Sequence, residues 1–454
     1  MCSRTPAILA AFSILLARGG TAQSEPQRAA NVTKTAESVR GEFVHAWSGY
    51  KKYAWGHDEL KPLTKTHRNW HEVPLLMTPV DALSTMLVMD LDDEATATRD
   101  FIAQNLSFDH DFFVKNFEIT IRVLGGLLSA YQTTGDERLL TLADDLGRRL
   151  VPVFDSPTGL PYMYVNLKTG AVKGDVTNPA EIGTLLVEFG TLGKLTGKSG
   201  YFDKAKRALV VLYDRRSPIG LVGSSINVKT GAWTDSTSHI SGGIDSYYEY
   251  LLKCARLFDD KDCERMWRTS IEAVNKYLAD ERSNGLWYGQ ANMFSGARTA
   301  TRYGALDAFF PAVLVLAGDV ERAKRLQESS FLMWSTFGIE PEEMDYTTMT
   351  VTYPGYPLRP EIAESAYYLY AATGDTRYQE MGRAILDSLM KHCRTDAGYA
   401  ALKDVQTKEK RDNMESFFLA ETLKYLYLVF APRETIDLTQ TVFNTEAHPI
   451  LKVR

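Results

Sequence analysis

Two kinds of helical segment alternate along most of this chain. In the first kind nearly every position is apolar, as in residues 366–372, so that such a helix must be buried on all sides. In the second kind apolar residues recur every three or four positions and charged residues occupy the other face, as in residues 377–386. The pattern predicts buried inner helices that alternate with half-exposed outer helices.

A recurring loop signal separates each inner helix from the outer helix that follows it. The signal reads Thr-Gly-Asp at residues 134–136 and 373–375, and related turns lie near residues 197, 259 and 318. A repeat of about sixty residues that holds two helices buries its apolar face only against its neighbours. Seven inner helices are predicted, starting near Pro79, Asn116, Pro179, Gly243, Gly304, Arg359 and Asn413. Closed on themselves, the repeats form an all-α fold, an (α/α)7 barrel.

Long segments rich in Gly, Ser, Thr, Tyr and Trp connect each outer helix to the next inner helix, for example residues 159–179 and 220–243. Lys-Thr-Gly turns at residues 168–170 and 229–231 predict small β-hairpins in these segments. Because long structured loops often carry function, we expect the functional site at this end of the barrel.

Each predicted inner helix carries an acidic residue near its start. An acid in a first turn is common, since the helix dipole favours it by about 0.3–1 kcal/mol. Seven acids at one mouth would repel one another, however, and would require a cation or a polar ligand. The seven are Asp81, Glu118, Glu181, Asp245, Asp307, Glu361 and Glu415.

The segment before the sixth inner helix places three charged residues together. Pro360 fits a first helical position, where its missing N–H costs nothing, and Glu361 and Glu364 then lie on the same helix face. Arg359 directly precedes them. The sequence therefore predicts a polar helix head beside a cavity.

The N-terminus indicates export. A short apolar run at residues 7–17 follows one basic residue and precedes small residues at 20–22, which predicts a signal peptide over residues 1–22 and a secreted or periplasmic protein. We expect a flexible segment over residues 23–39 and a single catalytic barrel domain over residues 40–454. The net charge of −6, without long basic runs, argues against a nucleic-acid partner. We further expect a monomer with no membrane partner.

Three cysteines remain after Cys2 leaves with the signal peptide. Cys254 and Cys263 flank a turn between two helices, and they are either a disulfide or two buried thiols. Cys393 is the third.

Several catalytic schemes lack their residues here. The chain has no Gly-x-Ser-x-Gly elbow, and residues 197–199 lack the earlier glycine of a phosphate loop because Leu192 occupies that position. His67 and His71 have a helical zinc spacing, but no glutamate lies between them and no third ligand is evident, so we interpret them as structural.

Carboxylates beside aromatic side chains remain, and this combination is used for glycoside hydrolysis, in which one acid protonates the leaving oxygen and another acts as base or nucleophile. Glu118 follows an aromatic residue. Asp245 and Glu249 lie one turn apart, and Phe417 and Glu421 repeat that spacing.

The motifs around these residues resemble the signatures of class I α-mannosidases, glycoside hydrolase family 47. The likeness extends from about residue 40 to the C-terminus, and its strongest runs are residues 46–56, 117–130, 245–253, 356–365, 414–427 and 443–449. We interpret the chain as a bacterial-type secreted member. The resemblance implies a calcium-dependent, inverting exo-α-1,2-mannosidase that removes terminal mannose from oligosaccharides or glycoproteins.

The resemblance also implies roles for individual residues. Glu118 matches the proposed general acid, Glu361 the base that activates water, and Asp245 a third carboxylate that is the alternative proton donor. Thr445 matches the direct protein ligand of calcium, through its carbonyl and hydroxyl. Substrate-binding positions are matched by Arg359, Glu364, Phe417, Glu421 and Glu446, and by the ring acids Asp81, Glu181 and Glu249.

One departure from the family pattern leaves the activity open. Many members place a bulky residue two positions before Asp245, whereas this chain has Gly243, as do the more lectin-like members associated with protein degradation. Gly243 leaves the branch preference open and keeps a second hypothesis, a mannose-glycan-binding module with little turnover. A third hypothesis, independent of Gly243, is an α/α-barrel hydrolase for another sugar.

Overall fold

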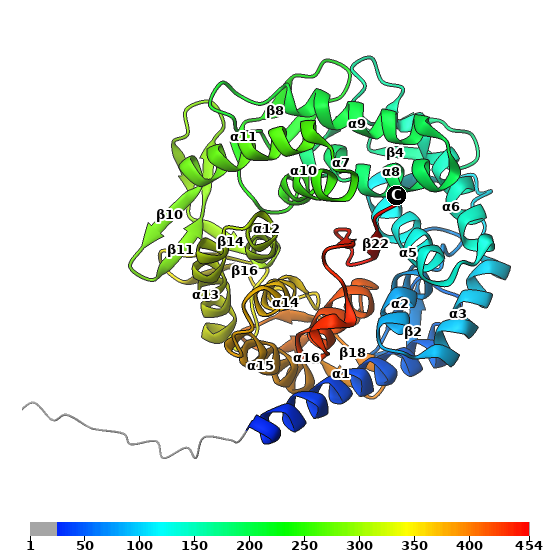
Figure 1. Cartoon of the computed structure of the whole chain (residues 1–454), viewed down its shortest axis with the longest axis vertical. Coiled ribbons are helices and arrows are strands. Elements are labelled where there is room, and N and C mark those ends of the chain that lie inside the picture. Colours follow the sequence, from blue (N-terminus) through cyan, green and yellow to red (C-terminus); the bar gives the residue numbers. More distant parts are fainter. Residues whose placement is uncertain (1–24, 454) are drawn as a thin grey trace, which may run out of the picture.

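The computed structural model describes the backbone of residues 25–453 and the side chains of residues 31–453. The predicted signal peptide lies outside the described residues. Within them the helices form a closed double ring, an (α/α)7 barrel, so the predicted fold is confirmed (Figure 1). The inner ring consists of α2 (Met77–Val88), α5 (Gly125–Thr134), α8 (Leu186–Thr196), α10 (Asp245–Phe258), α12 (Phe310–Ala317), α14 (Glu361–Thr373) and α16 (Leu423–Phe430). The outer ring consists of α3 (Asp92–Asn105), α6 (Glu137–Leu150), α9 (Ser199–Tyr213), α11 (Lys261–Tyr277), α13 (Val320–Phe337), α15 (Arg377–His392) and α1 (Glu25–Tyr53).

Helix α1 corrects the expectation of a flexible segment over residues 23–39, because the helix begins at Glu25. It packs against α16 and is thus the outer helix of the seventh repeat, so contact between the first and the last long helix of the described chain closes the ring. Ala36, Val39, Phe43 and Ala46 are buried at helical spacing, and burial of this apolar stripe holds the segment in place.

Short helical pieces precede several inner helices at the mouth of the barrel. Two of them are π-helical turns, in which one extra residue widens the helix, and such turns occur frequently at functional sites. The pieces are α4 (Asn116–Ile119), the π-helix η1 (Thr120–Leu124), α7 (Pro179–Gly183), η3 (Ala305–Phe309) and the π-helix η4 (Phe418–Thr422); η2 (Val151–Phe154) and η5 (Arg433–Thr435) lie elsewhere.

Short strands join neighbouring repeats. The strand before an inner helix pairs with the hairpin of the next repeat in four places: β3 with β4, β6 with β7, β9 with β12, and β14 with β15. Both predicted Lys-Thr-Gly hairpins are confirmed, as β4–β5 and β7–β8. The strands are β1 (Glu59–Lys61), β2 (Thr66–Arg68), β3 (Phe113–Lys115), β4 (Tyr164–Asn166), β5 (Val172–Lys173), β6 (Val176–Thr177), β7 (Ser225–Asn227), β8 (Trp233–Asp235), β9 (Thr237–Ser238), β10 (Ala279–Arg282), β11 (Gly285–Tyr288), β12 (Gln290–Asn292), β13 (Arg298–Ala300), β14 (Arg302–Gly304), β15 (Glu343–Asp345), β16 (Thr350–Tyr353), β17 (Arg394–Thr395), β18 (Gly398–Tyr399), β19 (Leu402–Asp404) and β20 (Glu409–Lys410).

The C-terminal hairpin, β21 (Thr441–Phe443) and β22 (Pro449–Leu451), lies inside the ring, where Figure 1 shows it in red. Two glycines of α5 make room for the turn between its strands. A Cβ on Gly125 would lie 2.5 Å from the side-chain nitrogen of Asn444, and one on Gly126 would lie 2.7 Å from Val80 and 3.3 Å from His448. The hairpin therefore closes the interior because these two helical positions have no side chain.

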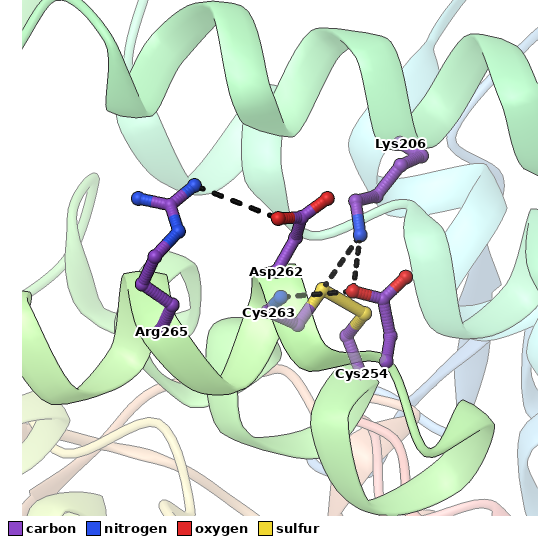
Figure 2. The surroundings of a disulfide bond; sticks show 6 residues. Lys206, Cys254, Asp262, Cys263 and Arg265 are labelled. Atoms are coloured by element: carbon purple, nitrogen blue, oxygen red, sulfur yellow. Dashed lines mark hydrogen bonds and ion pairs between the residues drawn. A yellow bond between two sulfur atoms is a disulfide. The ribbon is translucent and has the colours of Figure 1, made fainter.

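Cys254 and Cys263 form a disulfide, which decides between the two alternatives (Figure 2). The bond joins inner helix α10 to outer helix α11. Lys206 of α9 donates to Cys263 Sγ at 3.5 Å, so a third helix contacts the bridge. Cys393 is buried as a free thiol.

Candidate active site

The heads of the inner helices and the C-terminal turn enclose a cavity of about 300 Å³. Eleven of the twelve predicted site residues line it, and Asp81 is the exception. The eleven are Glu118, Glu181, Asp245, Glu249, Arg359, Glu361, Glu364, Phe417, Glu421, Thr445 and Glu446.

Local sequence explains how the helix heads aim their acids. The side chain of Asn178 caps α7 by accepting the Glu181 N–H at 3.0 Å, with Pro179 at the first helical position. In the sixth repeat the helix begins one residue later than predicted, because Pro360 is the cap of α14 and Glu361 its first residue. Glu361 and Glu364 nevertheless share the face that meets the cavity.

The cavity carries far more acid than base. Arg122 donates to Glu118 from Nε at 3.1 Å and from Nη2 at 3.0 Å, and it also pairs with Glu446. Lys115 pairs with Glu181 at 2.8 Å. Besides the eight lining carboxyls Glu118, Glu181, Asp245, Glu249, Glu361, Glu364, Glu421 and Glu446, the lining includes three cations, Lys115, Arg122 and Arg359.

Burial raises the pKa of two of the three carboxyls expected to carry the chemistry. It raises the pKa of Asp245 to about 7, and repulsion from Glu249 adds to the effect. Burial also raises the pKa of Glu361 to about 7; the nearby Arg359 opposes this rise, whereas Glu342 and Asp245 add to it. Both groups therefore exchange protons near neutral pH.

Three further cavity carboxyls show the same effect. Burial, and then repulsion from Glu249, raises the pKa of Glu364 to about 8. Burial is also the main reason that the pKa values of Glu421 and Glu446 lie well above their ordinary range. The cavity by itself thus favours protonated acids, and an added cation would favour their ionised forms.

Three carboxylate oxygens of the cavity lack a hydrogen-bond partner among the residues that this structure describes. Among residues 31–453, the buried Oε2 atoms of Glu181, Glu249 and Glu361 have no hydrogen-bond partner. Thr445, which has a backbone carbonyl and a side-chain hydroxyl, lines the same cavity. A donor set made of oxygens, with excess negative charge, suits a hard divalent cation such as calcium.

Asp81 was predicted to belong to the site, but it does not line the cavity. Its side chain is fully buried beneath the cavity, where it accepts a hydrogen bond from Ser416, lies 3.3 Å from His448 Nε2 and lies 3.7 Å from Arg122 Nη1. In this structure Asp81 therefore contacts Arg122, Ser416 and His448, and its role in substrate binding stays a prediction.

Two more of the seven acids predicted at the helix starts lie outside the cavity. Asp307 accepts the Gly304 N–H at 2.8 Å and so caps its own helix, and Glu415 accepts a hydrogen bond from Asn413 at 2.6 Å. Neither lines the cavity. The Asp307 contact is a capping role that short-range sequence preference favours. Glu415 instead contacts a side chain and lines an adjoining second cavity.

A second cavity of about 490 Å³ adjoins the first and shares Glu118, Arg122, Arg359 and Phe417 with it. The Phe417 ring lies between two guanidinium groups, 5.7 Å from Arg122 and 5.5 Å from Arg359. Arg122 also lies 5.5 Å from the ring of Trp70. This wall of aromatic rings and charges suits the apolar faces and hydroxyls of sugars.

Three charged residues at or beside the cavity were not predicted as site residues from the sequence: Lys115, Arg122 and Glu342. Lys115 lies one position before the second predicted inner helix, and this place beside a helix start could have indicated that it belongs to the site. Glu342 pairs with Arg359 from 17 positions earlier in the chain, a separation that no helical spacing predicts. The two histidines interpreted as structural stack on other rings, His67 on His57 and His71 on Phe112.

A toroid of helices that ends in a cavity of buried carboxyls beside aromatic rings is an arrangement compatible with glycoside hydrolysis. The chain belongs to glycosyl hydrolase family 47, whose sequence pattern matches residues 42–452. Alpha-mannosidase I MNS5 of Arabidopsis thaliana is 39% identical over 443 residues, which cover 91% of this chain and 76% of the relative. ER degradation-enhancing alpha-mannosidase-like protein 2 of Mus musculus is 39% identical over 452 residues, with 91% and 77% covered.

Among solved structures, an alpha-1,2-mannosidase from Trichoderma reesei superposes with a TM-score of 0.87 at 28% identity, covering 93% of this chain and 99% of that one. All three of these similar proteins are eukaryotic. The expectation of a bacterial-type member is therefore not supported.

Proposed function

We propose that this protein is a calcium-dependent, inverting exo-α-1,2-mannosidase that removes terminal mannose from oligosaccharides or glycoproteins. The observation that carries the proposal is that Asp245 and Glu361 line one cavity closed from below by the C-terminal turn. A closed end admits a single terminal sugar. Similarity to a structure named alpha-1,2-mannosidase supports the substrate class.

In this proposal Glu361 is the base. Its Oε2 is buried without a partner among the described residues, so it can accept a proton from a water that attacks the anomeric carbon. An inverting reaction needs about 6.5–9.5 Å between acid and base carboxyls to hold that water.

Asp245 is the better of the two candidates for the proton donor. Burial raises the pKa of Asp245 to about 7, as it does for Glu361, so the choice between Asp245 and Glu118 as donor rests on the contacts of Glu118. Glu118 accepts two hydrogen bonds from the guanidinium of Arg122, an arrangement that suits a carboxylate. Glu118 would then position the sugar or a water beside the leaving oxygen.

Thr445 would hold calcium through its carbonyl and hydroxyl, and the partnerless oxygens of Glu181, Glu249 and Glu361 would hold the waters around the ion. When bound, the ion would offset the carboxylate charge and orient sugar hydroxyls. The remainder of the glycan would extend into the second cavity, over Trp70 and Phe417.

The alternative is a glycan-binding module with little turnover, and Gly243 is the observation that favours it. This residue lines the cavity with a φ of 92°, and a Cβ at this position would lie 3.7 Å from the Asn178 side chain. Because glycine has no side chain, nothing restricts the entrance there. An open entrance allows binding of varied glycans without fixing the reacting bond.

NMR of the protein with an α-1,2-linked mannobioside separates these proposals. β-Mannose released first supports inversion, α-mannose first contradicts it, and binding without release supports the alternative. Glu361→Gln should lower turnover by about 10²–10⁴-fold. Asp307→Asn is the matched control, because that helix-head acid lies outside the cavity and asparagine retains its capping acceptor.

We also propose that the protein is secreted or lumenal and monomeric. No helix in the described part of the chain is long and apolar enough to span a bilayer. Size-exclusion chromatography with light scattering and detection of the protein in the medium of expressing cells would test both points.

A further inference from the structure

The turn over residues 444–448 is built around one buried carboxamide. Asn444 is fully buried, and its Oδ1 accepts the backbone N–H groups of Glu446 at 3.0 Å and His448 at 2.8 Å. Two backbone amides of the turn thus converge on a single side-chain oxygen.

This contact fixes the direction of the Thr445 carbonyl. The peptide group between Thr445 and Glu446 is planar and trans, so its N–H and C=O point in opposite directions. Because the N–H points toward Asn444, the carbonyl points away from Asn444. Thr445 itself lines the cavity.

The carboxamide of Asn444 is held in one of its two orientations. Its Nδ2 donates to the carbonyl of Ile121 and to Oε1 of Glu188, both at 2.8 Å. A reversed amide would place oxygen against these two oxygens, and it would also withdraw the acceptor from the turn.

Tyr250 of helix α10 also holds the turn over residues 444–448 in place. Its hydroxyl donates to Glu188 Oε1 at 2.7 Å and accepts the Thr445 N–H at 3.2 Å. Two other carbonyls of the turn are occupied as well, since Lys253 donates to Asn444 O at 3.3 Å and Lys424 donates to Ala447 O at 2.6 Å.

We propose that Asn444, Glu188 and Tyr250 are positioning residues that aim the carbonyl and hydroxyl of Thr445 and thereby set the affinity of the cavity for a hard divalent cation. The inference rests on the calcium site of the proposed function and adds to it the residues that hold the ligand in place. None of the three is needed to supply a ligand atom to the ion.

The test is calcium affinity, measured by titration calorimetry on the metal-free full-length protein, together with its melting temperature with and without calcium. Tyr250→Phe removes the hydroxyl that joins Thr445 to Glu188. We expect the calcium Kd to rise about 10–100-fold, as for loss of other groups that orient metal ligands. The melting temperature without calcium should change little.

Two further variants separate positioning from a merely structural role. Tyr247→Phe changes an equally buried tyrosine one turn earlier on α10, which packs against Gly183, and should leave the Kd at the wild-type value. Glu188→Gln keeps an oxygen acceptor for Tyr250 and Asn444, so the Kd should stay within about threefold of wild type.

An unchanged calcium Kd in Tyr250→Phe, or an equal rise in the calcium Kd of the Tyr250→Phe and Tyr247→Phe variants, would overturn the inference. Absence of calcium binding by the wild-type protein would overturn it too. In that case mannose release in the presence of a chelator would show whether the hydrolase proposal survives without the metal.

Discussion

The guanidinium of Arg122 donates two hydrogen bonds to a single oxygen of Glu118, at 3.1 and 3.0 Å, and pairs with Glu446 through its third nitrogen. Arg122 lies in the π-helical turn η1, and the same guanidinium stacks near Trp70. One side chain therefore fixes two cavity acids and part of the aromatic wall.

Replacing Arg122 with lysine tests this arrangement. Lysine keeps the charge but cannot donate in a planar fork, so Glu118 and Glu446 lose their fixed positions. We expect kcat for mannobioside cleavage to fall by about 100-fold, because small displacements of catalytic groups cost that much. Steady-state kinetics would show the loss in kcat.

Arg138→Lys is the matched control for that change. Arg138 also makes paired contacts with acids, Asp136 and Asp100, but on the exposed surface. The kcat of the Arg138→Lys variant should equal that of the wild type. Equal losses of kcat in both lysine variants would contradict the assigned role of Arg122.

The raised carboxyl pKa values predict how stability depends on pH. Between about pH 4 and pH 7 the folded protein holds protons on Asp245 and Glu361 that the unfolded chain has already released. Stability of the metal-free protein should therefore fall as pH rises through this window. Urea unfolding at pH 5 and pH 7.5 in a chelator would measure the fall.

Glu361→Gln should reduce that pH dependence, because glutamine does not titrate. Added calcium should restore stability mainly at the higher pH, where the acids are ionised. Equal changes in stability from pH 5 to pH 7.5 in the metal-free wild type and the metal-free Glu361→Gln variant would contradict the assignment.

Much of this site follows from short-range sequence patterns. The apolar periodicity and the loop signal gave the repeat, and an acid at each helix head marked where Glu118, Glu181, Asp245 and Glu361 would meet. The same pattern could not separate these acids from Asp81, because only the packing of His448 and Ser416 from the far end of the chain shows that Asp81 is covered.

Contacts between distant segments explain the other omissions. Glu342 reaches Arg359 only after two loops pair, and α1 is ordered because it lies on α16, nearly four hundred residues later. A single sequence shows that such segments are polar or amphipathic, but it does not show which other segment they contact.

The disulfide should contribute to stability more than to activity. Cys254 and Cys263 are separated by nine residues, and a loop of that length predicts about 2–3 kcal/mol of stabilisation in the chain-entropy estimate. Neither cysteine lines the cavity. Unfolding of the Cys254→Ala/Cys263→Ala variant should show this loss, with kcat at 25 °C near that of the wild type.

Gly125→Ala should displace the C-terminal turn. Its Cβ would approach the Asn444 side chain within 2.5 Å, and overpacking of this kind costs about 1–3 kcal/mol. Because Asn444 holds the Thr445 turn, calcium affinity should fall together with stability. Gly41→Ala in helix α1 is the control, since nothing lies within 4 Å of its Cβ and alanine favours a helix there by about 0.5–1 kcal/mol. Urea unfolding should show lower stability for Gly125→Ala and higher stability for Gly41→Ala, and calcium titration should show a higher calcium Kd for Gly125→Ala alone. A Gly125→Ala protein with wild-type stability and calcium Kd would mean that the turn does not need this space.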